Sequence, residues 1–205
     1  MCSSLSEGIL IVIEGIDGAG KTSVSKEVTR RLEDLGFKAI YTYEPYTQFI
    51  VNVVNEYWSE IDPVVQTLLM AADRYYHISK VILPYMSSGY VVISDRYYYS
   101  SLAYQGAQGV DLQWILDVNK FVVKPKLAVY LDVDPEVGLK RKKLSTTRIK
   151  GVEADIELIK RARKIYLDLV SRGELLLIDG RLDLGKVVDE VMGHIFKLIR
   201  GSNQS

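Results

Sequence analysis

One stretch near the start of the sequence has residue types and spacing that suit phosphate chemistry. Residues 15–22 follow the pattern G-x-x-x-x-G-K-[ST], in which glycines let successive backbone N–H groups surround a polyphosphate at a helix N-terminus. Lys21 is expected to reach the β- and γ-phosphates, and the Thr22 hydroxyl to ligate Mg²⁺. The residues of this phosphate loop are Gly15, Ile16, Asp17, Gly18, Ala19, Gly20, Lys21 and Thr22.

The residues on both sides of the loop predict the elements that position it. The apolar run Ile9–Ile13 is short enough to be a buried strand. After the loop, apolar residues recur at helical spacing up to Leu35, and Gly36 ends the predicted helix. A strand before the loop and a helix after it make a chance match to the pattern rare.

Four further apolar runs predict strands over residues 38–43, 90–94, 127–131 and 175–178, with helical patterns between them. One of these helices is expected to begin at Pro63 behind the capping residue Asp62, and another to cover residues 112–119. This alternation predicts an α/β fold of the P-loop NTPase type: a five-stranded parallel sheet with helices on both faces and a short lid. Ligands of such folds bind beyond the carboxyl ends of the strands. Polar residues gather at those ends, namely Asp17, Glu44, Asp95, Arg96 and Asp132.

Length and charge narrow the functional classes. The 205 residues suit a single domain, and the 26 basic and 26 acidic side chains give no net charge that would attract nucleic acid or a membrane surface. The single cysteine, Cys2, indicates a reducing compartment, and no run approaches the roughly 18 apolar residues of a membrane span. We therefore expect a cytoplasmic protein with no nucleic-acid or membrane partner.

A basic and polar stretch from Lys140 to Gly151 interrupts a helical pattern that continues to about Ser171. It has no acidic side chain to balance its positive charges. Such a run is either a solvated helix face or a lid that closes over phosphates, and we favour a lid at about residues 141–153.

A phosphate loop alone does not distinguish a motor, a switch, a kinase and a passive nucleotide binder. Asn119-Lys120 begins the base-reading N-K-x-D element of GTPases, but the aspartate is missing. A small-molecule kinase fits better, because transfer to a second ligand needs cations around both phosphate groups. Arg74 and Arg96, on separate elements, are the candidates for the second ligand.

Several stretches in combination resemble the thymidylate kinase family. They are residues 14–22, Glu44-Pro45, the segment LLMAADR at 68–74, and Asp95-Arg96-Tyr97 with the residues that follow it. The similarity extends through LDVDPE at 131–136 and covers nearly the whole chain. It implies one P-loop nucleoside monophosphate kinase domain over 1–205 that transfers the γ-phosphoryl group of ATP to dTMP with Mg²⁺, giving dTDP and ADP for dTTP synthesis.

The match to the family implies roles on the ATP side. All eight residues of the phosphate loop bind ATP, with Lys21 in catalysis and Thr22 on the metal. Asp95 supports the Mg²⁺ shell. Because Gly18 is small, the arginine that neutralises transition-state charge is expected in the lid, as Arg148 or Arg141. Arg141 alternatively lies against the adenine.

The match also implies roles on the acceptor side. Asp17 accepts a hydrogen bond from the sugar 3′-hydroxyl, and Arg96 grips the acceptor phosphate. Arg74 lies beside the base, Tyr104 packs under the deoxyribose, and Gln105 reads the base edge. The other substrate-binding residues are Glu44, Met70 and Ser100. The family also implies a homodimer formed by helix faces, to which the stripe Val64, Val65, Leu68 and Leu69 contributes unless the core buries it.

Three departures from the family pattern limit these assignments. Tyr43 and Tyr46 flank the Glu-Pro pair where an arginine is common, and Met70 stands where a phenylalanine usually stacks on thymine. Lys150-Gly151 stands where the family has Asp-Arg before the glutamate of the lid, to which Glu153 is matched.

Three alternatives therefore remain. They are a broader pyrimidine kinase that accepts dUMP or UMP, a deoxynucleoside kinase with Glu44 as general base, and a nucleotide-binding scaffold that transfers nothing.

Overall fold

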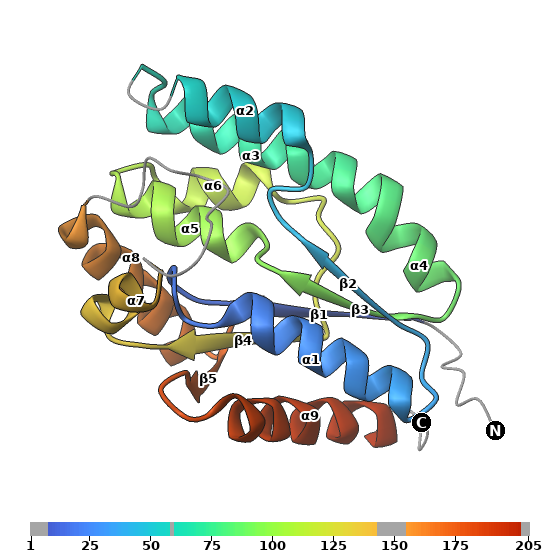
Figure 1. Ribbon diagram of the computed structural model, residues 1–205. Helices are drawn as coiled ribbons and strands as arrows, with labels where there is room; N and C mark the ends of the chain where they lie inside the picture. Colours follow the sequence, from blue (N-terminus) through green and yellow to red (C-terminus); the bar gives the residue numbers. More distant parts are fainter. Residues whose placement is uncertain (1–7, 58–59, 143–154, 202–205) are drawn as a thin grey trace.

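The computed structural model describes residues 8–57, 60–142 and 155–201 (Figure 1). Within them lies one sheet of five parallel strands in the order β2-β3-β1-β4-β5. The strands are β1 Ile9–Glu14, β2 Ala39–Tyr43, β3 Val91–Asp95, β4 Leu127–Asp132 and β5 Leu176–Asp179. The predicted five-stranded parallel sheet is confirmed, and each strand begins and ends within one residue of its predicted bounds.

Helices cover both faces of the sheet, as parallel strands of near-continuous aliphatic residues require. On one face, α1 Lys21–Asp34 packs beside α9 Leu184–Gly201 (Figure 1). On the other face, α4 and α8 contact the strands, and α5 lies between α3 and α8. Besides α1 and α9, the α-helices of the described residues are α2 Gln48–Glu56, α3 Pro63–His77, α4 Leu83–Ser87, α5 Tyr98–Ala107, α6 Leu112–Val118, α7 Pro135–Lys142 and α8 Ile156–Ser171.

The register of the sheet brings the polar strand ends together. Asp95 at the end of β3 pairs with Ile13 of β1 and Tyr43 of β2, and Asp132 pairs with Asp179. The carboxyl ends of β1, β2, β3 and β4 therefore share one edge, from which the loops leading to α1, α5 and α7 leave. This edge carries the candidate site.

Helix α3 continues through a π-helical turn, Ile78–Ile82, into α4. Asp62 caps its start as predicted, since its side chain accepts from the Val64 N–H at 2.7 Å. Helix α5 has no counterpart among the predicted elements, because eight of its ten residues are buried and it therefore lacks the polar face that marks an amphipathic helix.

The long helical pattern toward Ser171 is present as α7 and α8, and residues 143–154 between them lie outside the described residues. Among the helices of the described part of the chain, none has the length and apolar character needed to cross a membrane.

Candidate active site

The phosphate loop connects the carboxyl end of β1 to the first turn of α1. Gly20 occupies the N-cap position and gives α1 no side-chain cap, so the helix N-terminus presents its backbone N–H groups to an anion. Lys21 is buried, and its Nζ donates to the Ile16 carbonyl at 2.9 Å. Burial, aided by the nearby charge of Arg96, lowers the pKa of Lys21 to about 8. A bound polyphosphate would favour its charged form.

Thr22 and Asp95 form the oxygen pair expected at a magnesium site. The Thr22 hydroxyl donates to Asp95 Oδ2 at 2.5 Å. The other carboxylate oxygen, Asp95 Oδ1, is buried and has no hydrogen-bond partner in the described part of the chain. Hard oxygen donors beside a phosphate loop suit Mg²⁺, which is bound by one or two protein oxygens together with phosphate oxygens and water. The two residues therefore fit the ion.

Asp17, Arg96 and Tyr104 meet beside the phosphate loop. The Nη2 group of Arg96 donates to Asp17 Oδ1, and the Asp17 N–H donates to the Tyr104 hydroxyl at 3.2 Å. The Arg96 guanidinium lies over the Tyr104 ring, 5.4 Å from its centroid. Three residues assigned to the acceptor side thus come together from the phosphate loop, the β3–α5 connection and α5.

Glu44 and Arg74 form a second, more deeply buried cluster. Arg74 Nε donates to Glu44 Oε2 at 2.8 Å, its Nη1 to Asn119 Oδ1 at 2.6 Å and its Nη2 to the Ser101 hydroxyl at 3.2 Å. His77 Nδ1 lies 3.2 Å from the other Glu44 oxygen, and its Nε2 lies 2.6 Å from the Thr42 hydroxyl. The described neighbours of Arg74 therefore fix its guanidinium plane from three sides.

Asp73 holds the segment that follows Glu44-Pro45. Its carboxylate, 2% exposed, accepts from the Tyr46 N–H at 2.6 Å, the Thr47 N–H at 2.7 Å and the Thr47 hydroxyl at 2.6 Å. Tyr46 in turn stacks on the His77 ring at a centroid distance of 4.7 Å. These contacts place the C-terminal end of β2 against α3.

The remaining predicted residues lie at varied distances from this centre. The Ser100 hydroxyl accepts from Arg96 Nη1 at 3.1 Å, whereas Gln105 is buried and Met70 is partly buried on α3. Arg141, at the end of α7, donates to the Gly180 carbonyl at 2.9 Å. Arg148 and most of the predicted lid at 141–153 lie outside the described residues. Their assigned roles stay predictions.

Three residues to which no role is assigned from the sequence, Glu14, His77 and Tyr166, are all fully buried. Glu14 ends β1 and accepts hydrogen bonds from α5 and α8. Burial raises its pKa above the usual value, although these hydrogen bonds and Arg96 oppose the shift. The sequence feature that could have identified Glu14 is a carboxylate at the end of an apolar strand, because a buried charge needs hydrogen-bonding or charged partners.

The phosphate loop also touches α7 at a pair of glycines. A Cβ built on Gly18, where φ is +78°, would lie 2.0 Å from the Gly138 carbonyl oxygen. A Cβ on Gly138 would lie 2.6 Å from the Asp17 carbonyl oxygen. Both glycines are therefore required for this close approach of the loop to α7.

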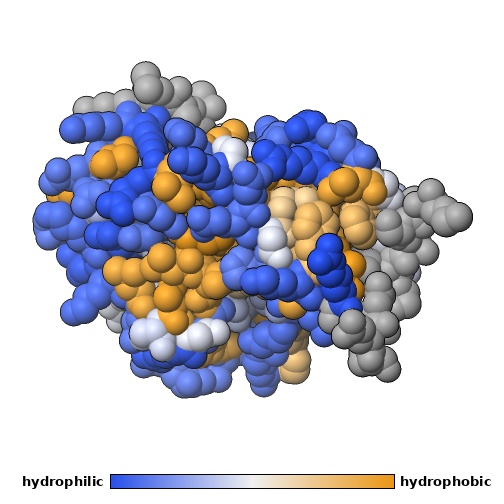
Figure 2. Space-filling model, turned by 90° about the horizontal axis from the view of Figure 1, so that it is seen from below, coloured by the Kyte–Doolittle hydropathy of each residue, from blue (hydrophilic) through white to orange (hydrophobic). Residues whose placement is uncertain are grey.

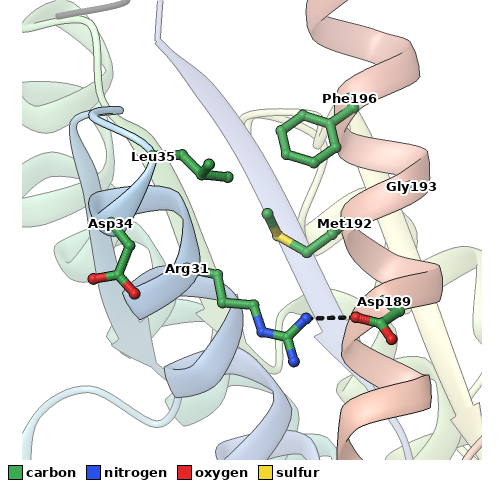
Figure 3. Close-up of a pocket in the computed structure, with 7 residues that line it drawn as sticks. All are labelled: Arg31, Asp34, Leu35, Asp189, Met192, Gly193 and Phe196. Carbon is green, nitrogen blue, oxygen red and sulfur yellow. Dashed lines mark hydrogen bonds and ion pairs between the residues drawn. The ribbon is translucent and has the colours of Figure 1, made fainter.

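A separate pocket of about 450 Å³ lies between α1 and α9. Leu35, Met192 and Phe196 line it, and an Arg31–Asp189 ion pair crosses its edge (Figure 3). Figure 2 shows hydrophobic side chains exposed among hydrophilic ones on the α9 side of the molecule. The pocket is reached from the C-terminal end of α1, and the phosphate loop precedes the other end of that helix. It is therefore distinct from the candidate active site.

Comparison with known proteins gives one consistent result. The family model for thymidylate kinase matches residues 13–191. A probable thymidylate kinase of Staphylothermus marinus is 45% identical over 189 residues, covering 92% of this chain and 94% of the relative. A probable thymidylate kinase of Pyrococcus horikoshii is 41% identical over 172 residues, covering 80% and 83%. Because the family model and the relatives match most of the chain, and its phosphate loop lies on a parallel sheet, the chain belongs to the thymidylate kinase family, whose members are ATP-dependent phosphotransferases.

Proposed function

We propose that this protein transfers the γ-phosphoryl group of ATP to dTMP, giving dTDP and ADP for dTTP synthesis. The contact of Arg96 with Asp17 carries the proposal, because it puts a candidate acceptor-phosphate residue against the loop that binds the donor phosphates. The relatives named as probable thymidylate kinases supply the identity of the acceptor.

The chemistry needs positioning and charge stabilisation rather than a protein nucleophile. An oxygen of the dTMP phosphate attacks the γ-phosphorus while the bond to the β-phosphate oxygen breaks, and ADP leaves. Lys21 holds the donor phosphates and Arg96 the acceptor phosphate, so two cations face the charge that develops between them. Asp17 accepts from the sugar 3′-hydroxyl, and Tyr104 packs beneath the sugar.

We assign the divalent cation of this kinase, Mg²⁺, to Thr22 and Asp95. The buried, unpartnered Asp95 Oδ1 supports this assignment, since a carboxylate oxygen that is shielded from water and bonded to none of the described groups is a ready ligand. When bound, the ion would supply charge neutralisation to the phosphate groups. Thr22 and Asp95 would hold it at the edge of the sheet beside the loop.

The contacts of Glu44 argue against a nucleoside kinase with a free carboxylate base. Both Glu44 oxygens face buried partners, Arg74 and His77, and the residue is 7% exposed. Its predicted contact with substrate is therefore better understood as orientation of Arg74 beside the base. Met70, in place of an aromatic ring, favours acceptance of dUMP as a second substrate.

We propose that the protein works as a homodimer. Val64, Val65 and Leu68 of the predicted stripe are each more than 40% exposed on α3, and Phe49 on the neighbouring α2 is 72% exposed. Exposed apolar side chains on adjacent helices suit a helix-face interface. The cytoplasm stays the proposed location, on the ground of a single cysteine at residue 2.

A coupled assay of ADP release with ATP and Mg²⁺ tests the proposal. The acceptors are dTMP, dUMP, UMP, CMP, AMP and thymidine, each offered separately. We expect the highest kcat/KM with dTMP. Equal rates with dUMP or UMP would replace it with the broader pyrimidine kinase, and no turnover with any acceptor would leave a nucleotide-binding scaffold.

A further inference from the structure

The backbone of Arg96 needs an external support. Its φ of +75° lies in the left-handed region, and no other non-glycine residue of the described ranges has a positive φ. This conformation is strained for a non-glycine residue and persists only where neighbouring contacts hold it. Two contacts lie on the strand side: the Arg96 N–H donates to the Ile13 carbonyl at 3.0 Å, and the Ser94 hydroxyl donates to the Arg96 carbonyl at 2.8 Å.

On the helix side, Glu14 of β1 holds the chain. Helix α5 begins after Tyr97, whose own side chain makes no capping hydrogen bond. Instead Glu14 Oε1 accepts from the Tyr97 N–H at 2.7 Å and from the Ser100 N–H at 3.2 Å. These are the N-cap and third helical positions, which a local capping box would normally satisfy. A carboxylate from another strand thus caps α5 and fixes the residue next to Arg96.

The second Glu14 oxygen supports the Arg96 side chain through hydroxyl groups. Glu14 Oε2 accepts from the Ser100 hydroxyl at 2.7 Å and from the Tyr166 hydroxyl at 2.8 Å. The Ser100 oxygen in turn accepts from Arg96 Nη1 at 3.1 Å. With its own proton donated to Glu14, Ser100 is oriented as an acceptor for the guanidinium.

Tyr166 belongs to α8 and is fully buried, so it acts only through this chain of contacts. Its ring stacks on Tyr130 of β4 at a centroid distance of 4.7 Å and an interplanar angle of 16°. The stack fixes the ring plane, and the plane aims the hydroxyl at Glu14. Tyr130 directs its own hydroxyl elsewhere, to Asp132 Oδ1 at 2.9 Å.

We propose that Glu14 and Tyr166 are positioning residues that, through Ser100 and the capped start of α5, aim the Arg96 guanidinium at the acceptor phosphate. The proposal rests on the proposed function for the identity of the acceptor. It predicts that loss of the Tyr166 hydroxyl harms recognition of the phosphate and spares recognition of the nucleoside.

The test compares Tyr166→Phe with the matched control Tyr130→Phe, which removes the other hydroxyl of the same ring stack. Calorimetry measures the affinity of each protein for dTMP and for thymidine, which has the same base and sugar without the phosphate. We expect Tyr166→Phe to weaken dTMP binding by about tenfold and to change thymidine binding by less than about twofold, since the lost hydrogen bonds act on a charged group. Tyr130→Phe should change neither. Equal losses for both ligands, or none, would overturn the proposal.

A second measurement needs no substrate. The Arg96 side-chain NMR signals, identified by their loss in Arg96→Lys, report how tightly the guanidinium is held. We expect separate Nη signals in the wild type and in Tyr130→Phe, and averaged signals in Tyr166→Phe and Glu14→Gln. Unchanged signals in Tyr166→Phe and Glu14→Gln would refute the proposal that these residues position Arg96, even if Tyr166→Phe could not be assayed with ligands. A wild type that does not phosphorylate dTMP would refute the proposed function and leave this measurement valid.

Discussion

The clearest energetic prediction concerns Asp73. Replacement by alanine removes a buried carboxylate that accepts three hydrogen bonds from Tyr46 and Thr47. Asp62→Ala is a matched control, because it removes the same residue type from the same helix at an exposed position with a single hydrogen bond to the Val64 N–H.

We expect Asp73→Ala to lower the free energy of unfolding several times more than Asp62→Ala does. A hydrogen bond to a charged group contributes about 1.5–3 kcal/mol, and the three donors left by Asp73→Ala regain only part of their hydration, so we expect a loss of about 3–4 kcal/mol. Loss of the Asp62 cap should cost about 1 kcal/mol. Asp73→Asn, which keeps one acceptor oxygen and turns an amide N–H₂ toward the same donors, should fall between them.

Urea denaturation followed by circular dichroism measures these differences, provided that the slope with denaturant is the same for all four proteins. The acceptor side should respond as well, because Tyr46 packs on His77, which contacts Glu44. We therefore expect Asp73→Asn to raise the KM for dTMP and to leave the KM for ATP unchanged. If Asp73→Ala lowered the free energy of unfolding by no more than Asp62→Ala does, the Asp73 carboxylate would not hold the segment that follows Glu44-Pro45.

Three further predictions concern groups of the candidate site. Burial raises the folded-state pKa of Glu14 above the unfolded value of 4.5, so the unfolded state loses its proton first and stability falls as pH rises through the window above 4.5. Glu14→Gln should remove this fall in stability, measured by urea denaturation at a series of pH values. A pH profile parallel to that of the wild type would contradict the prediction. Arg74→Lys cannot reproduce the three fixed hydrogen bonds of the guanidinium and should cost about 2–4 kcal/mol in thermal or urea unfolding; a loss under about 1 kcal/mol would show that the cluster is not rigid. Asp95→Asn should weaken binding of ATP with Mg²⁺ by about tenfold or more, measured by calorimetry, while ATP with EDTA binds as in the wild type. Equal losses with and without the metal would remove Asp95 from the magnesium site.

The strands and the phosphate loop were predictable because their signals are local. Runs such as Ile9–Ile13 are short and apolar, and the glycines and lysine of the loop have fixed spacing. The edge of the sheet that carries Asp95 and Arg96 followed from the rule that parallel strands end together.

Contacts between distant parts of the chain were not predictable in the same way. Glu14 caps a helix 83 residues further along, and Tyr166 reaches it from 152 residues away. Neither residue stands in a local pattern that names its partner. Helix α5 escaped prediction for a related reason, because tertiary burial on nearly all sides replaces the periodicity that a sequence can show. The cluster of Glu44, Arg74 and His77 likewise has no local sequence signal, because it depends on how β2 packs against α3.

The contact between Gly18 and Gly138 constrains how this sequence can evolve. Any side chain at position 18 meets a backbone oxygen of α7, so the obstacle does not depend on which residue occupies position 138. A substitution at either position becomes tolerable only after the α7 backbone has shifted, which makes the order of mutations matter. We expect that a library of single substitutions will contain no tolerated replacement at position 18 or position 138. A relative with a larger residue in this part of the loop should carry compensating changes along the segment that corresponds to α7.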